Sequence, residues 1–375
     1  MAKQKVAPRS AASGLAGVLD SPEIGQLAAE LQETRWTGRP GYPIRAMIGM
    51  ALAKSIYSIP TWTRTVALVQ EHAALRHAIS GHGEVPSVYA CYRFTAKLRR
   101  FAPMLDACLD RVTASLHAEM PEMGQDVAID ASDLPAYANG QRYVSKGGRE
   151  RERFADPDAS WGHRSAVSTR KGGGYYGYKL HAAVCARTGL PVAWKVQTAK
   201  ANESTFAVAL IDATRARGFA VETCAMDKGY DLGPIYDACE DRDCRPIMPL
   251  RETPAVKRGD DKPPTCEHGE WRFAGSDFTR KASKWRCPTG ECKPGSTWVK
   301  SSRRDPLIPR SSKRFRDLYR GRGAVEREFG RLKGYYGLAP LRVRGIGRVS
   351  LHADLVMLAR LSQALARARA VPLAA

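Results

Sequence analysis

The stretch that decides the fold is Tyr319-Arg-Gly-Arg-Gly-Ala-Val-Glu-Arg-Glu-Phe-Gly-Arg-Leu-Lys333. On a helix of 3.6 residues per turn, four of its polar side chains would lie within about 60° of arc. These four are Tyr319, Arg322, Glu326 and Lys333. An apolar stripe beside them would face a core, and it consists of Leu318, Val325, Phe329, Leu332 and Tyr336. One carboxylate between two cations, next to an aromatic ring, suits a site that holds a metal ion against a phosphate backbone. A solvated helix face has the same spacing.

Two glycines limit where this helix begins. Gly321 and Gly323 are poor helix formers, so we expect the helix to begin near Ala324. Tyr319 would then lie in the approach to the helix.

The chain is strongly basic, and much of the excess charge surrounds the same stretch. Its 375 residues include 59 Lys and Arg against 38 Asp and Glu, a formal net charge of +21. Residues 300–375 contain 18 Lys and Arg against 5 Asp and Glu. A charge this large predicts a polyanionic partner, with nucleic acid ahead of an anionic membrane surface.

Apolar runs and cysteines indicate the compartment. No signal peptide is visible, and the apolar run 47–53 is too short to span a bilayer. The nine cysteines are odd in number and widely spread. We therefore expect a reduced, cytoplasmic protein without a disulfide framework and without a membrane partner.

The first third of the chain has helical periodicity. Residues 1–18 are small, polar and basic, which predicts a flexible arm. Residues 19–120 predict an all-helical domain with clear breaks and caps. Its last basic helix, capped by Ser87, carries Arg93, Lys97 and Arg100. This helix is either a recognition helix in a DNA groove or a packing helix with a solvated basic face.

Strand patterns begin after residue 120 and alternate with helices. A short apolar run ends at Asp130, a hairpin turns at Arg187-Thr-Gly189, and another apolar run ends at Asp227. The pattern predicts an α/β domain built from residues 121–250 and 313–372, with a polar loop over 139–171. Residues 251–312 are rich in Cys, Lys and Pro and read as an insertion.

Three motifs carry a resemblance to a known family. The spacing Tyr-x2-Arg-x3-Glu-x6-Lys of residues 319–333 resembles the signature of bacterial insertion-sequence transposases with a DDE catalytic triad. Ala128-Ile-Asp-Ala-Ser132 and Met226-Asp-Lys-Gly-Tyr230 resemble the other two catalytic motifs, in the same order. Residues 38–94 resemble the helical N-terminal domain of that group. The resemblance implies an RNase H-like mixed sheet with helices on both faces, preceded by an all-α domain.

The resemblance also implies a reaction. Asp130, Asp227 and Glu326 would be the catalytic residues and the metal ligands, because their hard oxygens suit Mg²⁺ or Mn²⁺. Two such ions would support cleavage at the element ends and joining of 3′-OH ends to target DNA. Arg322 and Lys333 would bind phosphates, and Tyr319 would position the DNA end. A homodimer or larger assembly would hold two ends of double-stranded DNA.

Some of the individual residue assignments have alternatives. A strand-end Asp is often a turn residue, and Asp133 competes with Asp130 for the first position. A strand places these two side chains on opposite faces, and we favour Asp130 for its apolar lead-in. His181 lies on a neighbouring strand, and we interpret it as a strand histidine outside the site.

Two other functions fit the same residues. One is a relic that still binds DNA but no longer cuts it, and the other is an RNase H-like nuclease without strand transfer. The complete triad counts against a relic, and the separate helical domain counts against a general nuclease.

The insertion contains a possible zinc site. Cys266, His268, Cys287 and Cys292 could supply four ligands, although no Cys-x2-Cys pair is present. Unligated thiols are the alternative.

Overall fold

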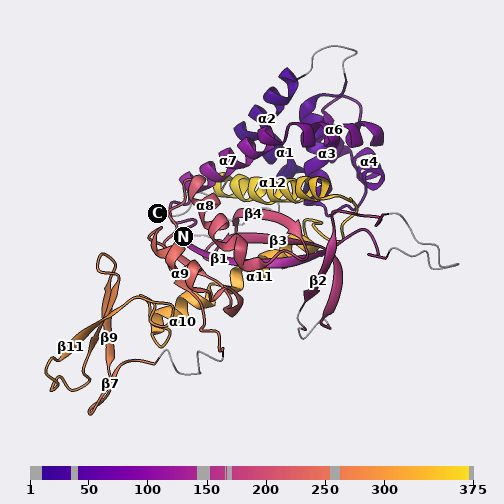
Figure 1. Ribbon diagram of the computed structural model, residues 1–375. Helices are drawn as coiled ribbons and strands as arrows, with labels where there is room; N and C mark the ends of the chain where they lie inside the picture. The colour runs from indigo at the N-terminus through magenta and orange to yellow at the C-terminus, as the bar shows by residue number, and fades with distance from the viewer. Residues whose placement is uncertain are drawn as a thin grey trace.

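The computed structural model describes residues 11–34, 41–141, 153–164, 166, 171–253 and 262–370. Helices of the N-terminal part lie against a mixed sheet, and a small β module projects from the other end (Figure 1). None of the helices in the described ranges is both long and apolar enough to cross a membrane.

Seven helices form the N-terminal part that the structure describes. They are α1 (Ala11–Leu19), α2 (Pro22–Glu33), α3 (Ile44–Ile56), α4 (Trp62–Glu71), α5 (Ala73–Ser80), α6 (Val88–Arg100) and α7 (Ala102–Glu119). Side-chain caps begin two of them, since Thr61 accepts from the N–H of Arg64 and Ser87 from that of Ala90. This part confirms the predicted helical region ahead of the sheet.

The start of the chain differs from our expectation. Residues 11–18 were predicted to belong to a flexible arm, but they form most of α1, while residues 1–10 lie outside the described part. Leu15, Val18 and Leu19 are buried, at positions i, i+3 and i+4 of one helix face. Because these three residues are surrounded by Ala, Gly and Ser, the apolar face gave no clear helical pattern in the sequence.

The sheet is mixed. Its strands are β1 (Asp126–Pro135), β2 (Ser160–Arg164), β3 (Gly173–Cys185), β4 (Pro191–Thr198), β5 (Thr223–Ala225) and β6 (Arg245–Ile247). The order is β2-β3-β1-β5-β6, and β4 also pairs with β3. β3 runs antiparallel to β1, β2 and β4, whereas β5 is parallel to β1 and β6 is parallel to β5.

Helices cover both faces of this sheet. They are α8 (Ala207–Ala216), α9 (Gly233–Glu240), α10 (Lys313–Arg320), α11 (Gly323–Gly334) and the long α12 (Ile346–Ala370). On β4, Trp194 donates to Asp354 of α12 over 2.9 Å, while its neighbour Lys195 lies over the ring of Phe206, which leads into α8. Consecutive strand residues point to opposite faces, so α12 and α8 lie on opposite sides. The predicted α/β arrangement is confirmed.

The predicted polar loop 139–171 contains structure that the sequence did not reveal. It includes β2 and the fully buried Asp156, although residues 142–152, 165 and 167–170 lie outside the described part. Asp156 accepts hydrogen bonds from the Tyr178 hydroxyl at 2.7 Å and the Gly345 N–H at 3.1 Å. These bonds tie the segment to β3 and to the approach to α12.

The insertion is a small β module. Its strands are β7 (Thr265–Cys266), β8 (Gly269–Glu270), β9 (Arg272–Asp277), β10 (Ala282–Arg286) and β11 (Ser296–Lys300). β9, β10 and β11 form one sheet, and β7 and β8 form a separate hairpin. Its strands are too short to give a clear sequence period. Figure 1 shows the module projecting beyond α10, away from the N-terminal helices.

Candidate active site

Two aspartates occupy matching positions along neighbouring parallel strands. Asp130 lies within β1, which continues beyond it, whereas Asp227 follows the end of β5. β1 and β5 are in register with Ala128 opposite Ala225. Asp130 and Asp227 each follow two residues later, and parallel strands lie about 4.8 Å apart. The Asp227 carboxylate also accepts the Gly229 N–H at 2.7 Å, so its turn is capped by the side chain itself. The two carboxyl groups therefore lie at the same edge of the sheet.

An arginine brings Glu326 to this edge. Glu326 lies in the first turn of α11, and Arg322 directly precedes that helix. The Arg322 guanidinium donates to Asp130 Oδ2 at 3.2 Å and to Glu326 Oε1 at 2.5 Å. One cation thus joins the first and third carboxylates, which are far apart in the sequence. We call Asp130, Asp227 and Glu326 the carboxylate cluster.

The cluster concentrates negative charge in a partly buried place. The pKa of Asp130 is raised to about 7, chiefly by burial, with smaller contributions from the nearby Asp227 and Glu203. The hydrogen bond from the Ala131 N–H and the charge of Arg322 act in the opposite direction. Glu203 is held by Lys179 at 2.8 Å.

Tyr319 lies beside the cluster on a helix of its own. The helix that carries Glu326 begins at Gly323, close to the predicted start, but Tyr319 lies on α10 and not in an irregular approach. Its ring stacks on Phe315 with centroids 6.0 Å apart, and Arg322 lies 6.0 Å from the ring. The short helix forms because Ser312 caps it, accepting from the N–H of Phe315.

Lys333 and Asp133 meet elsewhere on β1. Lys333 donates to the Asp133 backbone oxygen at 2.6 Å, and its amine lies 3.6 Å from the Asp133 carboxylate. Arg164 of β2 pairs with the same carboxylate at 3.2 Å. Asp130 and Asp133 both lie on β1, three residues apart, and side chains at that spacing on a strand alternate between its faces. Lys333 therefore ties the last turn of α11 to the end of β1.

His181 lies on the other face of the sheet from Asp130. It is opposite Ala131 in the register of β1 and β3, and its ring lies 4.5 Å from that of Phe206. Burial lowers its pKa to about 4, and Lys179 and Lys195 add to this effect. The sequence interpretation, which left His181 outside the site, agrees with this position.

The basic face of α6 is partly engaged within the protein. Arg93 and Arg100 are exposed, whereas Lys97 is half-buried and donates to the Leu31 backbone oxygen at 2.9 Å. Lys97 therefore also anchors α6 to the end of α2.

Another face of α6 borders a basic groove that the sequence did not reveal. Tyr92 and Arg99 line it together with a segment distant in the chain. In that segment, Arg342 and Arg344 lie 5.4 and 5.2 Å from the ring of Tyr137. The groove has a volume of about 560 Å³. No local motif could have predicted it, because its two walls are joined only by the fold.

Sequence reasoning also missed the buried acid of α11. Glu328 is fully buried, and Arg360 of α12 donates to it at 2.7 Å. Arg331 pairs with its second oxygen at 2.9 Å. This ion pair fixes the helix that carries Glu326, two residues away.

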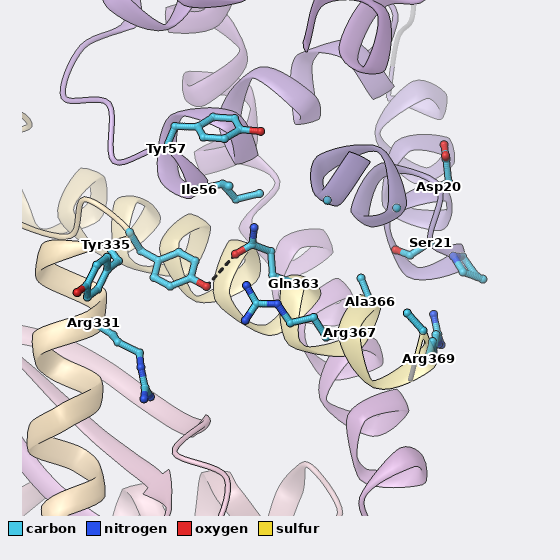
Figure 2. A pocket seen from close by; sticks show the side chains of 15 residues that line it. Asp20, Ser21, Ile56, Tyr57, Arg331, Tyr335, Gln363, Ala366, Arg367 and Arg369 are labelled. Atoms are coloured by element: carbon cyan, nitrogen blue, oxygen red, sulfur yellow. Dashed lines mark hydrogen bonds between the residues drawn. The ribbon is translucent and has the colours of Figure 1, made fainter. Parts of the chain in front are cut away.

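A pocket at the other end of α11 contains none of the three carboxylates. It has a volume of about 1000 Å³ and lies between the first helices and the ends of α11 and α12. Figure 2 shows Arg331 and Tyr335 on one side, Tyr57 on another, and the hydrogen bond from Tyr336 to Gln363.

The four possible zinc ligands of the insertion do meet. Cys266, His268, Cys287 and Cys292 place their ligand atoms within 4.8 Å of one another. We call them the Cys/His cluster.

Comparison with known proteins identifies the family. The family described as "Transposase DDE domain" matches residues 122–362. No curated protein matches the chain. Among solved structures, a cryo-EM structure of the piggyBac transposase synaptic complex with hairpin DNA has a TM-score of 0.41 and 10% identity, covering 95% of this chain and 74% of that chain. The family match spans more than half of the chain and includes the whole carboxylate cluster, so the protein belongs to the transposases with a DDE domain.

Proposed function

We propose that the protein is the DNA transposase of an insertion sequence. It cuts DNA at the ends of the element and joins the freed 3′-OH ends to target DNA in the cytoplasm. The observation that carries this proposal is the meeting of Asp130 and Asp227, from adjacent parallel strands, with Glu326 from the first turn of α11.

The catalytic part is RNase H-like in this proposal. An antiparallel hairpin and two parallel strands surround a long central strand, β1, and the last helices return to it. Such an arrangement would support catalysis by carboxylates from a strand and from a helix.

The residues of the cluster fit a divalent metal. Their hard carboxylate oxygens suit Mg²⁺ or Mn²⁺, and carboxylates gathered at one place repel one another unless a cation lies between them. Asp130, Asp227 and Glu326 would hold the ions. Bound metal, as a pair of ions, would supply an activated water or 3′-hydroxyl and stabilise the leaving oxygen.

Arg322 has two tasks in this scheme. In the free protein its guanidinium neutralises Asp130 and Glu326. With the carboxylates neutralised by metal, the same guanidinium can turn to a DNA phosphate, which it binds in a fork geometry. Tyr319, packed beside it, would position the DNA end, and Lys333 would contact a phosphate further along the strand.

The helical part would recognise the element ends. Arg93, Lys97 and Arg100 would contact their DNA, with the phosphate attraction supplying most of the salt dependence. Neutralising all three should weaken end binding and flatten its salt dependence, and an unchanged salt slope would remove this assignment. Since two ends must be held together, we propose a homodimer or larger assembly on double-stranded DNA.

The function is tested with the element's own ends on a plasmid. We expect cleavage at the ends with Mg²⁺ or Mn²⁺, no cleavage with EDTA, and no cleavage by Glu326→Gln. Joined products should then appear with target DNA. Binding without cleavage in any metal would instead indicate a DNA-binding relic, and cleavage that never yields joined products would indicate a nuclease.

A further inference from the structure

The inserted module brings three sulfur atoms and one imidazole together from separate turns. Cys266 ends β7, and His268 lies in the turn that leads to β8. Cys287 follows β10, and Cys292 lies in the loop before β11. Two of the module's turns therefore close on a single point.

The distances between these atoms match one tetrahedral zinc site. Cys266 Sγ lies 3.8 Å from Cys287 Sγ, and His268 Nδ1 lies 3.4 Å from Cys292 Sγ and 3.9 Å from Cys287 Sγ. With Zn–S bonds of about 2.3 Å and Zn–N bonds of about 2.0 Å, tetrahedral ligand atoms are roughly 3.5–3.8 Å apart. The spacing is thus that of ligands around an ion.

A carboxylate orients the histidine. Glu291 Oε2 lies 3.0 Å from His268 Nε2, the ring nitrogen that points away from the sulfur atoms. A histidine that donates its second N–H to a carboxylate keeps the other nitrogen free of a proton and ready to bind metal. Glu291 therefore selects the tautomer that the cluster requires.

A disulfide does not explain the cluster. The 3.8 Å between the sulfur atoms of Cys266 and Cys287 is far beyond the bond length of about 2.05 Å. A disulfide between Cys266 and Cys287 would also not explain why His268 and Cys292 lie beside them. Thiolate and imidazole ligands favour Zn²⁺ over the hard cations that suit carboxylates.

The module has little else to hold it. Its strands are two to six residues long, and its buried side chains include Ala282, Ser283 and Trp285. Small units of this kind commonly depend on a metal for stability. Four protein ligands leave no open position on a tetrahedral ion, as in structural zinc sites.

We propose that Cys266, His268, Cys287 and Cys292 bind one structural Zn²⁺ that folds the module of residues 262–300. Glu291 is a positioning residue that holds His268. This site is separate from the carboxylate cluster. The proposed transposase function would therefore stand even if these four residues bound no zinc.

The first experiment uses the unmodified full chain purified from zinc-containing medium without chelator. We expect one zinc per chain by elemental analysis. Replacing it with Co²⁺ should give the strong visible and thiolate charge-transfer absorption of a tetrahedral site with sulfur ligands, which carboxylates do not produce. Absence of both zinc and the cobalt signal, or an intramolecular disulfide between these cysteines, would overturn the proposal.

Variants locate the ion. The double variant Cys266→Ser/Cys292→Ser should lose the zinc, and His268→Cys, which offers a fourth thiolate, should retain it. Glu291→Gln should weaken zinc binding by about tenfold. Glu270→Gln, at an exposed position of β8, serves as its control and should leave binding unchanged. Full zinc content in the double variant would place the ion elsewhere and contradict the assignment.

Discussion

We propose that the carboxylate cluster and the Cys/His cluster each hold a cation, and their ligands differ in chemistry and in their distribution along the chain. The first gathers hard oxygens from two strands and a helix, spread over residues 130–326, and an arginine already lies among them. The second gathers soft ligands from residues 266–292, and an acid supports its histidine. The first therefore depends on the whole α/β fold and leaves room for exchange, whereas the second is local and closed.

This comparison predicts different consequences when each is disturbed. A change in the packing of α11 or β1 should alter the chemistry at the carboxylates and leave the zinc in place. A change in the module should release the zinc and leave the chemistry at the carboxylates unaltered.

The largest effect is expected at the first aspartate. Asp130→Ala should reduce end cleavage by about a thousandfold or more, because a metal ligand contributes several kcal/mol to the transition state. Asp133→Ala, on the opposite face of the same strand, should keep cleavage, as measured by initial rates on the same plasmid. The zinc content should be the same in both. Loss in Asp133→Ala with activity in Asp130→Ala would reverse the assignment.

The second effect concerns the support of α11. Arg360→Met leaves Glu328 buried without its strongest partner, so we expect a loss of about 3–5 kcal/mol in the free energy of unfolding, measured by denaturant titration. Adding Glu328→Leu should restore much of it, because the unpaired charge is then gone. Zinc should remain bound throughout. A stable Arg360→Met protein would show that this ion pair does not hold the helix.

The third effect concerns the ion pair between Glu23 of α2 and Arg369 of α12. Burial tends to raise the pKa of Glu23, but hydrogen bonds from Arg369 and Ser115 outweigh it and lower the pKa to about 2. Glu23→Gln should cost about 2 kcal/mol near neutral pH, a value reduced for the partial exposure of Arg369.

The pH dependence of this pair has a definite sign. Folding lowers the pKa of the Glu23 carboxyl from its ordinary value of 4.5 to about 2. The stabilisation is therefore complete above about pH 4.5 and declines as the pH falls toward about 2. The melting temperatures of the wild-type protein and Glu23→Gln should therefore draw closer as the pH falls from about 4.5 toward about 2. A difference that grows over that interval would contradict the pairing.

The smallest effect separates the two tasks of Arg322. Without DNA, Arg322→Gln should bind Mg²⁺ more tightly, by about tenfold or on the order of 1.4 kcal/mol, because the competing cation is gone. Its cleavage of element ends should nevertheless fall. Isothermal titration and cleavage assays on the same preparation make the comparison, and weaker Mg²⁺ binding would show that Arg322 helps to build the metal site.

Local patterns were enough to predict much of this molecule. Apolar runs ending in Asp130 and Asp227 and the spacing from Tyr319 to Lys333 led to the α/β domain, and the structure places Glu326 next to Asp130 through Arg322. The four residues of the Cys/His cluster were also recognisable as a group, because they lie within one short segment. What these examples share is a signal contained within a few turns of chain.

Long-range pairs were not predictable in this way. Glu328 looks like one more charge on a basic helix, and only the approach of Arg360 turns it into a buried partner. Lys333, for which we propose a phosphate contact, donates to the backbone of Asp133 in this structure, and no local pattern indicated that contact. α1 was missed because its apolar face consists of three residues among small ones.

The central claim is that Asp130, Asp227 and Glu326 together hold the catalytic metal. In the most direct test, Fe²⁺ replaces Mg²⁺ in the zinc-saturated protein. An added oxidant then makes the bound iron cut the polypeptide backbone close to it, and mass spectrometry maps the cuts. We predict cuts close to residues 130, 227 and 326 that excess Mg²⁺ suppresses and that Glu326→Gln weakens. Cuts that avoid these three positions, or that Mg²⁺ does not suppress, would contradict the claim.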